Sequence, residues 1–479
     1  MVEEKFDFSS GLKKKLIIVA VIGVLLLIVG SLMPMGGGHE TASDAPHTEV
    51  TVEGAGHDNA GDHEEEAEAA HGESEDHENE NADHGVVVDG HEAEAVTHGG
   101  TADHGEVTWF KRFKIDFWIN NVYFIGLALI GMFFFALQYA AQAGWSASMI
   151  RVPLSMAHWL PISGVLLLVS FLLFGSDIFH WTADYLYDHN DPGYDHLIDG
   201  KKGFFFGPGA SGGGIPVFFL VRMVLFFGVW IFLFRKLKGL ALQEDEIGGV
   251  EIWAKMRKFS AIFLIVFAVS SSISAWDWIM SIDTHWYSTM FGWYVFASWW
   301  VSGLAFITLV VVLLKEAGYL SQVNMSVIHD LGKLTFAFSV FWTYIWFSQF
   351  LLIYYANIPE ESVYFVDRML SDKYGSFFII NLIMNFFFPF LVLMTRDTKR
   401  LFVFLKIACI VILAGHWIDF YLMVTPGTLG DGGAFGLTEI GLFMVFGAAF
   451  VFVTLKALSQ NALVAKNHPM LDEAKHHHI

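Results

Sequence analysis

Ten apolar runs dominate the hydrophobic pattern of this 479-residue chain. Each is 18 to 25 residues long, which is enough for an α-helix to cross a hydrocarbon core of about 30 Å. The pattern therefore predicts an all-α, polytopic integral membrane protein with ten transmembrane helices. The runs cover residues 16–33, 117–140, 153–174, 214–234, 258–280, 290–314, 332–356, 376–395, 401–424 and 436–457.

The first run follows three lysines, a start that it shares with secretory signal peptides. Its core is long and no A-x-A cleavage site follows Pro34, so we interpret it as a retained first span. The chain then divides into four parts: residues 1–34, with the first span; residues 35–110, an insert; residues 111–457, a nine-helix membrane domain; and residues 458–479, a tail.

Residues 35–110 interrupt the apolar pattern with an acidic, histidine-rich insert of low complexity. They hold 21 of the 49 Asp and Glu, ten His from His39 to His104, and no Lys or Arg. The formal charge of −21 belongs to this insert, because the rest carries 28 acids against 28 Lys and Arg. We expect a disordered, solvated tether, with imidazole binding of Zn²⁺, Cu²⁺ or Ni²⁺ as the alternative. No basic surface points to nucleic acid.

The basic residues predict the orientation of the helices. With a cytoplasmic amino terminus, 20 of the 28 Lys and Arg lie on the cytoplasmic side, seven lie outside, and Arg222 alone lies within a span. Both termini are then cytoplasmic, and residues 35–110 lie outside. The basic cluster at 111–114 departs from the rule and indicates an interfacial helix.

Residues 276–300 carry Asp277, Asp283 and His285 among tryptophans and tyrosines, a composition typical of a membrane–water interface. Ionisable groups at that depth are costly to keep and raise a functional hypothesis. A helix-end turn whose carboxylates face water is the alternative interpretation. One face of the span 258–280 also carries polar residues at i, i+4, i+7 and i+11, which suits either a packing seam or a polar site: Ser270, Ser274, Asp277 and Ser281.

In the span 401–424, His416 and Asp419 share a helix face because they are three residues apart. Such a pair can relay protons or simply hydrogen-bond. The expected depths place these groups in one outer polar cavity that leads partway into the helices. The candidates for a proton pathway are Asp277, His416, Asp419, Glu439, Asp283, His285, Asp177, His180 and Arg222. No catalytic, cofactor-binding or metal-ligating residue is predicted.

Cysteine and histidine positions argue against cofactors bound by this chain. Cys409 is the only cysteine, which excludes an intrachain disulfide, a C-x-x-C-H haem attachment and an iron–sulfur cluster held by this chain alone. Bis-His ligation of haem b needs two histidines at similar depth on facing helices, and only His416 lies well within the outer half of a span.

Several stretches resemble a known family of membrane proteins. They are residues 276–292, HDLGKL at 329–334, FAFSVFWTYIWFSQFLLIYYANIPEE at 336–361, and FDFSSGLKKK at 6–15. These stretches look like the F subunits (ActF) of bacterial alternative complex III, a quinol:cytochrome c oxidoreductase of the electron transport chain. The resemblance extends over all ten spans, whereas the acidic insert is not part of the shared pattern.

The resemblance implies a polysulfide-reductase-like (NrfD-like) protein of the bacterial inner membrane, with two four-helix bundles flanked by extra helices and residues 35–110 periplasmic. It implies as partners a homologous quinol-binding membrane subunit, a periplasmic iron–sulfur subunit and c-type cytochrome subunits, with lipid, quinone and a terminal oxidase nearby. Haem c and iron–sulfur clusters are then expected in the partner subunits. The F subunit itself is expected to be non-catalytic, supporting assembly or proton translocation.

Two other functions stay open from the sequence. The chain could bind and oxidise quinol itself, with Asp277 and His416 taking the quinol proton. It could instead be a ten-helix secondary transporter, although the sequence has no matched pair of Gly- or Pro-interrupted spans. Co-purification with haem-bearing partners favours the respiratory functions, and a colourless single protein favours the transporter.

Overall fold

The computed structural model describes residues 4–32 and 107–478. Contacts divide the chain into two units, Met1–Pro34 with His104–Ile479, and Met35–Asp103. The second unit lies outside the described residues, and so does the insert predicted at 35–110 up to residue 106. Its last two residues, Trp109 and Phe110, are the first residues of α2. The described residues form helices and no β-strand, which confirms the all-α class.

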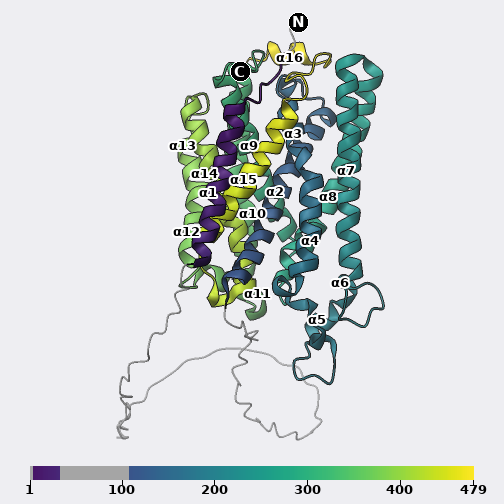
Figure 1. Ribbon diagram of the computed structural model, residues 1–479, viewed down its shortest axis with the longest axis vertical. Helices are drawn as coiled ribbons and strands as arrows, with labels where there is room; N and C mark the ends of the chain where they lie inside the picture. The colour runs from purple at the N-terminus through teal and green to yellow at the C-terminus, as the bar shows by residue number, and fades with distance from the viewer. Residues whose placement is uncertain (1–3, 33–106, 479) are drawn as a thin grey trace, which may run out of the picture. The chain divides into compact units, whose positions relative to one another are not determined.

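Ten helical segments of the described chain are long and apolar enough to cross a membrane, as the apolar runs predict. The protein is therefore a polytopic integral membrane protein. Figure 1 shows the segments side by side: α1 (Ser10–Leu32), α2 (Trp109–Ala140), α3 with α4 (Arg151–Met156, Leu160–Ile178), α7 (Val217–Glu246), α8 (Val250–Trp278), α9 (Phe291–Glu316), α10 (Met325–Ala356), α12 with α13 (Gly375–Leu382, Phe388–Val392), α14 (Phe402–Leu429) and α15 (Leu437–Leu458).

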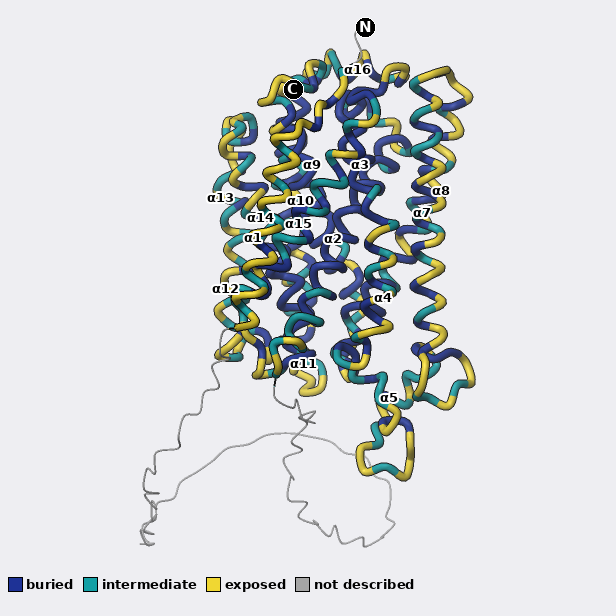
Figure 2. Tube along the Cα trace, viewed as in Figure 1, coloured by how far each residue is buried: buried dark blue, intermediate teal, exposed yellow. Residues whose placement is uncertain are grey.

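Eight of these segments form two four-helix bundles. In the first bundle, α2 packs on α4 and α8, and α7 closes the ring between them. In the second bundle, α9 packs on α10 and α14, and the α12–α13 segment closes the ring. Helices α2 and α9 also pack on each other and are buried along most of their length, whereas α7 and α10 keep exposed faces (Figure 2). The two bundles therefore meet along α2 and α9.

Helix α1 flanks the bundles, and α15 is its main neighbour. At Gly23 and Gly441 the two backbones touch: a Cβ on Gly23 would lie 2.6 Å from Gly441 O, and a Cβ on Gly441 would lie 2.7 Å from Gly23 O. Small residues that let helix backbones approach are typical of membrane helix pairs. The rest of α1 leaves its apolar side chains largely exposed.

Both described chain ends lie at one end of the membrane unit, which we call the terminal end (Figure 1). There Leu463 N donates to Glu4 O at 3.0 Å, and Lys5 pairs with Ala462 in an isolated antiparallel bridge. The opposite, loop end carries three short helices: α5 (His196–Gly200), α6 (Lys202–Phe205) and α11 (Pro359–Met369). Because ten is an even number of crossings, the chain ends on the side of the membrane where it began, which agrees with the position of both ends at the terminal end.

Several helices extend beyond their apolar runs, and α2 and α7 are two examples. Helix α2 begins at Trp109, with Thr108 Oγ1 accepting from Lys111 N at 3.2 Å. The expectation of a separate interfacial helix at 111–114 is therefore wrong, because these residues form the first turns of the span. Helix α7 likewise continues to Glu246, well past its apolar run. Hydropathy marks the hydrocarbon crossing, while the helix itself continues into the polar interface.

One span contains a π-helical turn, Ile383–Phe387, between α12 and α13. Pro389 lies two residues after this turn, and in a regular α-helix its ring would clash with the carbonyl of Asn385. A π-helical turn accommodates such an interruption of the hydrogen-bond ladder. The turn carries Asn385 and begins two residues after Asn381, and both side chains face the interior of the second bundle, where they are buried.

Candidate functional site

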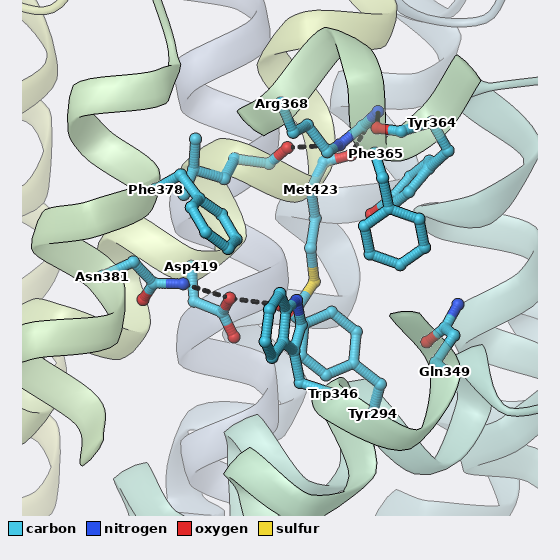
Figure 3. A pocket seen from close by; sticks show the side chains of 11 residues that line it. Tyr294, Trp346, Gln349, Tyr364, Phe365, Arg368, Phe378, Asn381, Asp419 and Met423 are labelled. Carbon is cyan, nitrogen blue, oxygen red and sulfur yellow. Dashed lines mark hydrogen bonds between the residues drawn. The ribbon is translucent and has the colours of Figure 1, made fainter. Parts of the chain in front are cut away.

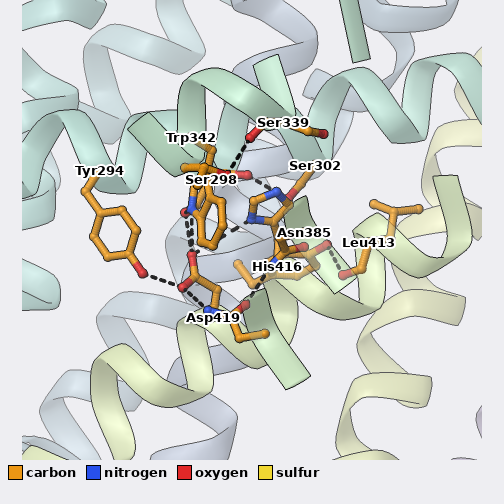
Figure 4. A network of polar contacts seen from close by, with 12 residues as sticks. Tyr294, Ser298, Ser302, Ser339, Trp342, Asn385, Leu413, His416 and Asp419 are labelled. Carbon is orange, nitrogen blue, oxygen red and sulfur yellow. Dashed lines mark hydrogen bonds and ion pairs between the residues drawn. The ribbon is translucent and has the colours of Figure 1, made fainter. Parts of the chain in front are cut away.

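The carboxylate of Asp419 is fully buried within the second bundle (Figure 4). Its Oδ2 accepts from Ser298 Oγ at 2.6 Å and from Trp342 Nε1 at 3.1 Å. Its Oδ1 accepts from Asn381 Nδ2 at 2.9 Å and from the Tyr294 hydroxyl. These donors come from α9, α10 and α12, and Asp419 belongs to α14. All four helices of the bundle thus meet at one carboxylate, and the four donors are uncharged.

His416 lies on the same face of α14, three residues before Asp419, and is also fully buried. Its Nδ1 is 3.8 Å from Asp419 Oδ2, and neither ring nitrogen has a hydrogen-bond partner within the described chain. The ring packs edge-on against Trp342, with centroids 5.3 Å apart. A buried polar group without a partner costs about 1–3 kcal/mol. The imidazole is therefore a buried polar group that a water molecule or a small shift of a neighbouring side chain could satisfy.

Two asparagines extend this network toward the π-helical turn. Asn385 Nδ2 donates to Asn381 Oδ1 at 2.5 Å, and Asn381 in turn donates to Asp419. Gly415 makes room for this contact, because a Cβ there would lie 2.3 Å from Asn385 Oδ1. The irregular span and the glycine thus position the amides beside the carboxylate.

A small cavity lies between Asp419 and Arg368 of α11 (Figure 3). It offers about 20 Å³ to the centre of a water-sized sphere, and one water needs roughly 10–15 Å³ by that measure. Polar side chains of Tyr294, Gln349 and Asn381 also line it, together with aromatic and aliphatic groups. Gln349 Nε2 has no hydrogen-bond partner in the described residues. The cavity therefore suits a water molecule next to the carboxylate.

Arg368 separates this cavity from the loop end. Its Nη2 donates to Asp283 Oδ2 at 2.7 Å, its Nε donates to Leu422 O at 2.9 Å, and its guanidinium stacks 3.5 Å over the Tyr364 ring. Asp283 lies in the connection between α8 and α9. Burial raises the pKa of Asp283 above its usual value, although the Arg368 charge lowers it. The Asp283 carboxyl, which lies between the loop end and the cavity, therefore holds a proton more readily than a free aspartate.

The first bundle holds a different kind of carboxylate. Arg222 of α7 donates to Asp277 of α8 through two parallel bonds, Nε to Oδ2 at 2.8 Å and Nη2 to Oδ1 at 2.6 Å. Arg222 Nη1 also donates to Phe204 O at 2.6 Å. On the same face of α8, Ser270 accepts from Trp230 Nε1 at 2.9 Å. The polar face of this span is thus an inter-helix seam closed by a bidentate ion pair.

The remaining candidates lie apart from both carboxylates. Each has its own neighbour: Glu439 pairs with Arg112 at 2.7 Å, Asp177 with Lys114 at 2.7 Å, and His285 with Asp195 at 2.5 Å, while His180 lies in a turn beside the Tyr185 ring. The expectation that the outer polar groups share one cavity and hydrogen-bond to each other is therefore wrong. The apolar runs predict how deep each residue lies in the membrane, but they carry no signal for the lateral position of each helix.

Sequence reasoning missed several residues of these sites. Arg368 belongs to a short loop segment that reads as mixed charge, yet α11 buries Tyr364, Phe365 and Arg368 on one face. The i, i+4 spacing of Tyr364 and Arg368 is the signal that could have found it. Asp116 of α2 was also missed: it is buried beside Asn120, and its Oδ2 has no hydrogen-bond partner among the described residues.

Within residues 4–32 and 107–478, no three His, Cys, Asp or Glu side chains converge as metal ligands. Comparison of the chain with protein-family models and with curated proteins finds no match.

Proposed function

We propose that this chain is a membrane subunit of a quinol:cytochrome c oxidoreductase of the alternative complex III type, and that its second bundle conducts protons. The architecture of two four-helix bundles with flanking α1 and α15 agrees with what the sequence resemblance implies. The observation that carries proton conduction is the buried Asp419 carboxylate, held by four uncharged donors beside the unpartnered imidazole of His416.

Uncharged donors matter because they leave the charge of the carboxylate uncompensated by any fixed cation. Asp419 can then take up a proton, and the neighbouring hydroxyl and amide groups can reorient to its neutral form. A charged residue embedded in the membrane interior is expensive and marks a functional site by default. His416, 3.8 Å away, is the nearest group able to receive the proton.

Access from the loop end leads past Asp283 and Arg368 into the water-sized cavity and from there to Asp419. Toward the terminal end, buried hydroxyls continue along two facing helices: Ser302 and Thr308 on α9, and Ser339 and Thr335 on α10. Thr308 and Thr335 lie 3.3 Å apart. His329 follows near the terminal end of α10, with its Nδ1 unpartnered in the described structure. This series supplies proton carriers for the second half of the path.

The size of the cavity favours protons over quinol at this site. A space of about 20 Å³ for water centres accommodates a water molecule, and a quinol ring needs several times more. We therefore assign quinol oxidation to the homologous membrane subunit, and haem c and iron–sulfur clusters to partner subunits. The excess of basic residues at the terminal end supports an orientation in which that end faces the cytoplasm and the loop end faces the periplasmic partners.

Membership in the complex is tested by purifying the affinity-tagged chain from its native membrane in mild detergent. We expect haem c absorbance and iron–sulfur protein to co-elute with the chain in fixed ratio. A colourless, monodisperse single protein that is fully folded would contradict membership and favour the transporter.

Proton conduction is tested with His416→Phe in the complex reconstituted into liposomes. Because neither imidazole nitrogen makes a hydrogen bond to a described residue, the phenyl ring removes none of those bonds, and the assembled complex should form normally. Quinol-driven proton translocation per electron should fall, while Cys409→Ala, a buried change on the same helix, should leave it unchanged. Equal proton-to-electron ratios in both variants would contradict the proposal.

A further inference from the structure

A second small pocket lies at the terminal end of the first bundle, between α3, α7 and the residues that follow α15. Its interior offers about 20 Å³ to water-sized centres, which is room for a water molecule, and one side of the pocket is open to the surface. Its polar lining consists of Arg151, Ser155, His158, Lys238 and Asn461, and aliphatic side chains complete the wall. None of these residues belongs to the proposed proton path.

One positive charge in this pocket has no acidic partner among the residues that the structure describes. Arg151 Nη2 pairs with Asp245 Oδ2 at 2.6 Å, which neutralises the guanidinium. Lys238 Nζ lies 2.8 Å from His158 Nε2, and His158 Nδ1 lies 3.1 Å from the carbonyl of Ser155. The carbonyl can only accept, so Nδ1 carries the proton and Nε2 accepts from the ammonium. His158 is therefore neutral, and the Lys238 ammonium has two further N–H donors for a ligand.

The pocket lies at the end of an apolar stripe that is exposed on the surface of the isolated chain. His158, Ile162, Val165 and Val169 recur at i, i+4, i+7 and i+11, so they lie along one face that continues from the preceding turn into α4. The three aliphatic side chains are 41%, 62% and 45% exposed in the isolated chain. On the neighbouring α7, Phe232 is also exposed. The Lys238 cation therefore lies next to an exposed apolar surface.

We propose that the open mouth of this pocket, at Lys238, binds the phosphate of an anionic phospholipid, whose acyl chains lie along the Ile162–Val165–Val169 stripe. Lys238 supplies the charge and hydrogen-bond donors for the phosphate, and the Asn461 amide offers a further donor. Basic pockets between membrane helices near the interface recognise such head groups. The apolar stripe distinguishes a lipid from free phosphate, because the stripe adds affinity only when acyl chains are attached.

The experiment measures binding to the delipidated full-length chain in detergent, titrated with phosphatidylglycerol, phosphatidylcholine or sodium phosphate. Phosphatidylglycerol should bind more tightly than phosphatidylcholine, and added NaCl should weaken its binding. Lys238→Met keeps the aliphatic stem and should weaken phosphatidylglycerol by about fivefold, the usual worth of one lysine at a lipid head group. Lys236→Met, two residues away over the Phe259 ring, is the matched control and should bind like the wild type.

Equal affinities for the two lipids, or equal loss in the Lys238 and Lys236 variants, would overturn the proposal. Displacement of phosphatidylglycerol by millimolar phosphate would assign the pocket to free phosphate and overturn it as well. If Lys238→Met does not fold, the wild-type salt dependence decides, because binding that ignores NaCl involves no unpaired lysine charge.

Discussion

Each four-helix bundle carries a buried carboxylate on its fourth helix in chain order, α8 in the first bundle and α14 in the second. The side chains that hold the two carboxylates differ in charge. In the first bundle, the third helix supplies Arg222, whose guanidinium holds Asp277 through two bonds. In the second bundle, the third helix supplies Asn381, and the other donors to Asp419 are also uncharged. The same helix positions therefore carry a closed ion pair in one bundle and an open polar network in the other.

The difference teaches what a buried carboxylate can do in a membrane. An arginine cannot be deprotonated in proteins, so the Asp277–Arg222 pair is neutral as a unit and a fixed positive charge compensates its carboxylate. Asp419 lacks such a counter-ion, and it has a histidine and a water-sized cavity beside it. We infer that the first bundle uses its carboxylate for structure and the second uses its carboxylate for exchange.

The largest effect is expected from breaking the ion pair of the first bundle. Asp277→Leu leaves Arg222 buried and unpaired, which should cost about 3–5 kcal/mol of stability and lower the yield of assembled complex. The double variant Arg222→Met with Asp277→Leu removes both charges and should recover most of the yield, measured by size-exclusion chromatography and thermal unfolding. A double variant as poor as the single one would show that the pair is more than structural.

The matching change in the second bundle should act on turnover and not on assembly. Asp419→Asn keeps the shape of the side chain but cannot take up a proton, so quinol oxidation by the intact complex should fall by about 10²-fold, the low end for a lost proton-transfer group. Haem content per complex serves as the assembly control. Normal turnover across the whole pH range in this variant would end the distinction between the bundles.

The C-terminal segment contacts the two bundles differently, which allows a comparison by pH. His468 inserts between Tyr139 and Trp253 of the first bundle, with ring centroids 5.2 Å from each. Burial, and then the charge of Arg151, lower the pKa of His468 from 6.5 to about 4. His477 instead lies 2.6 Å from Asp330 of the second bundle and is partly exposed.

The lowered pKa of His468 means that the undocked segment binds a proton at higher pH than the docked one. Docking is then fully favourable above pH 6.5 and weakens as the pH falls toward 4, with a loss on the order of 2 kcal/mol by pH 5. Hydrogen exchange of residues 459–475 between pH 7 and 5 should show this release, and His468→Phe should remove the pH dependence. If hydrogen exchange changed equally with pH in the wild type and in His468→Phe, the pH dependence of docking would not come from His468.

The smallest effect separates two serines that each bond a tryptophan indole. Ser270 accepts from Trp230 in the first bundle, and Ser298 accepts from Trp342 while donating to Asp419 in the second. Each Ser→Ala change should cost about 1 kcal/mol of stability, the usual worth of one hydrogen bond. Only Ser298→Ala should also slow turnover, by a few fold. Equal turnover in the two variants would show that the donors around Asp419 are structural only.

The sequence predicts the number of spans well because hydrocarbon thickness imposes a minimum apolar length on each helix. It also places His416 and Asp419 on one face, because a spacing of three is local to one helix. It does not predict which residues pair between helices. Arg222 and Asp277 are 55 residues apart, and Arg112 and Glu439 are 327 apart. Such pairs depend on the lateral order of the helices, for which hydropathy carries no signal.

For a second reason, the donors around Asp419 could not be identified from the sequence. Tyr294 and Trp342 lie in strongly aromatic runs, where each reads as one more apolar or interfacial residue. The hydroxyl and indole N–H become donors only because the packing of α9 and α10 directs them at a carboxylate on α14. Asn381, by contrast, stands out as a polar residue in its span and was recognisable.

The glycine contact between α1 and α15 has a consequence for the order of events in biosynthesis, because α1 cannot pack on α15 until α15 has been made. Gly23 is translated 418 residues before Gly441, the residue that it touches. At about 5–20 residues per second, α1 waits roughly 20–80 s before its main neighbour leaves the ribosome. During that interval α1 resides in the membrane with all its apolar faces toward lipid. We therefore expect insertion of the first helix to precede its packing, with the docking of α1 among the last steps of maturation.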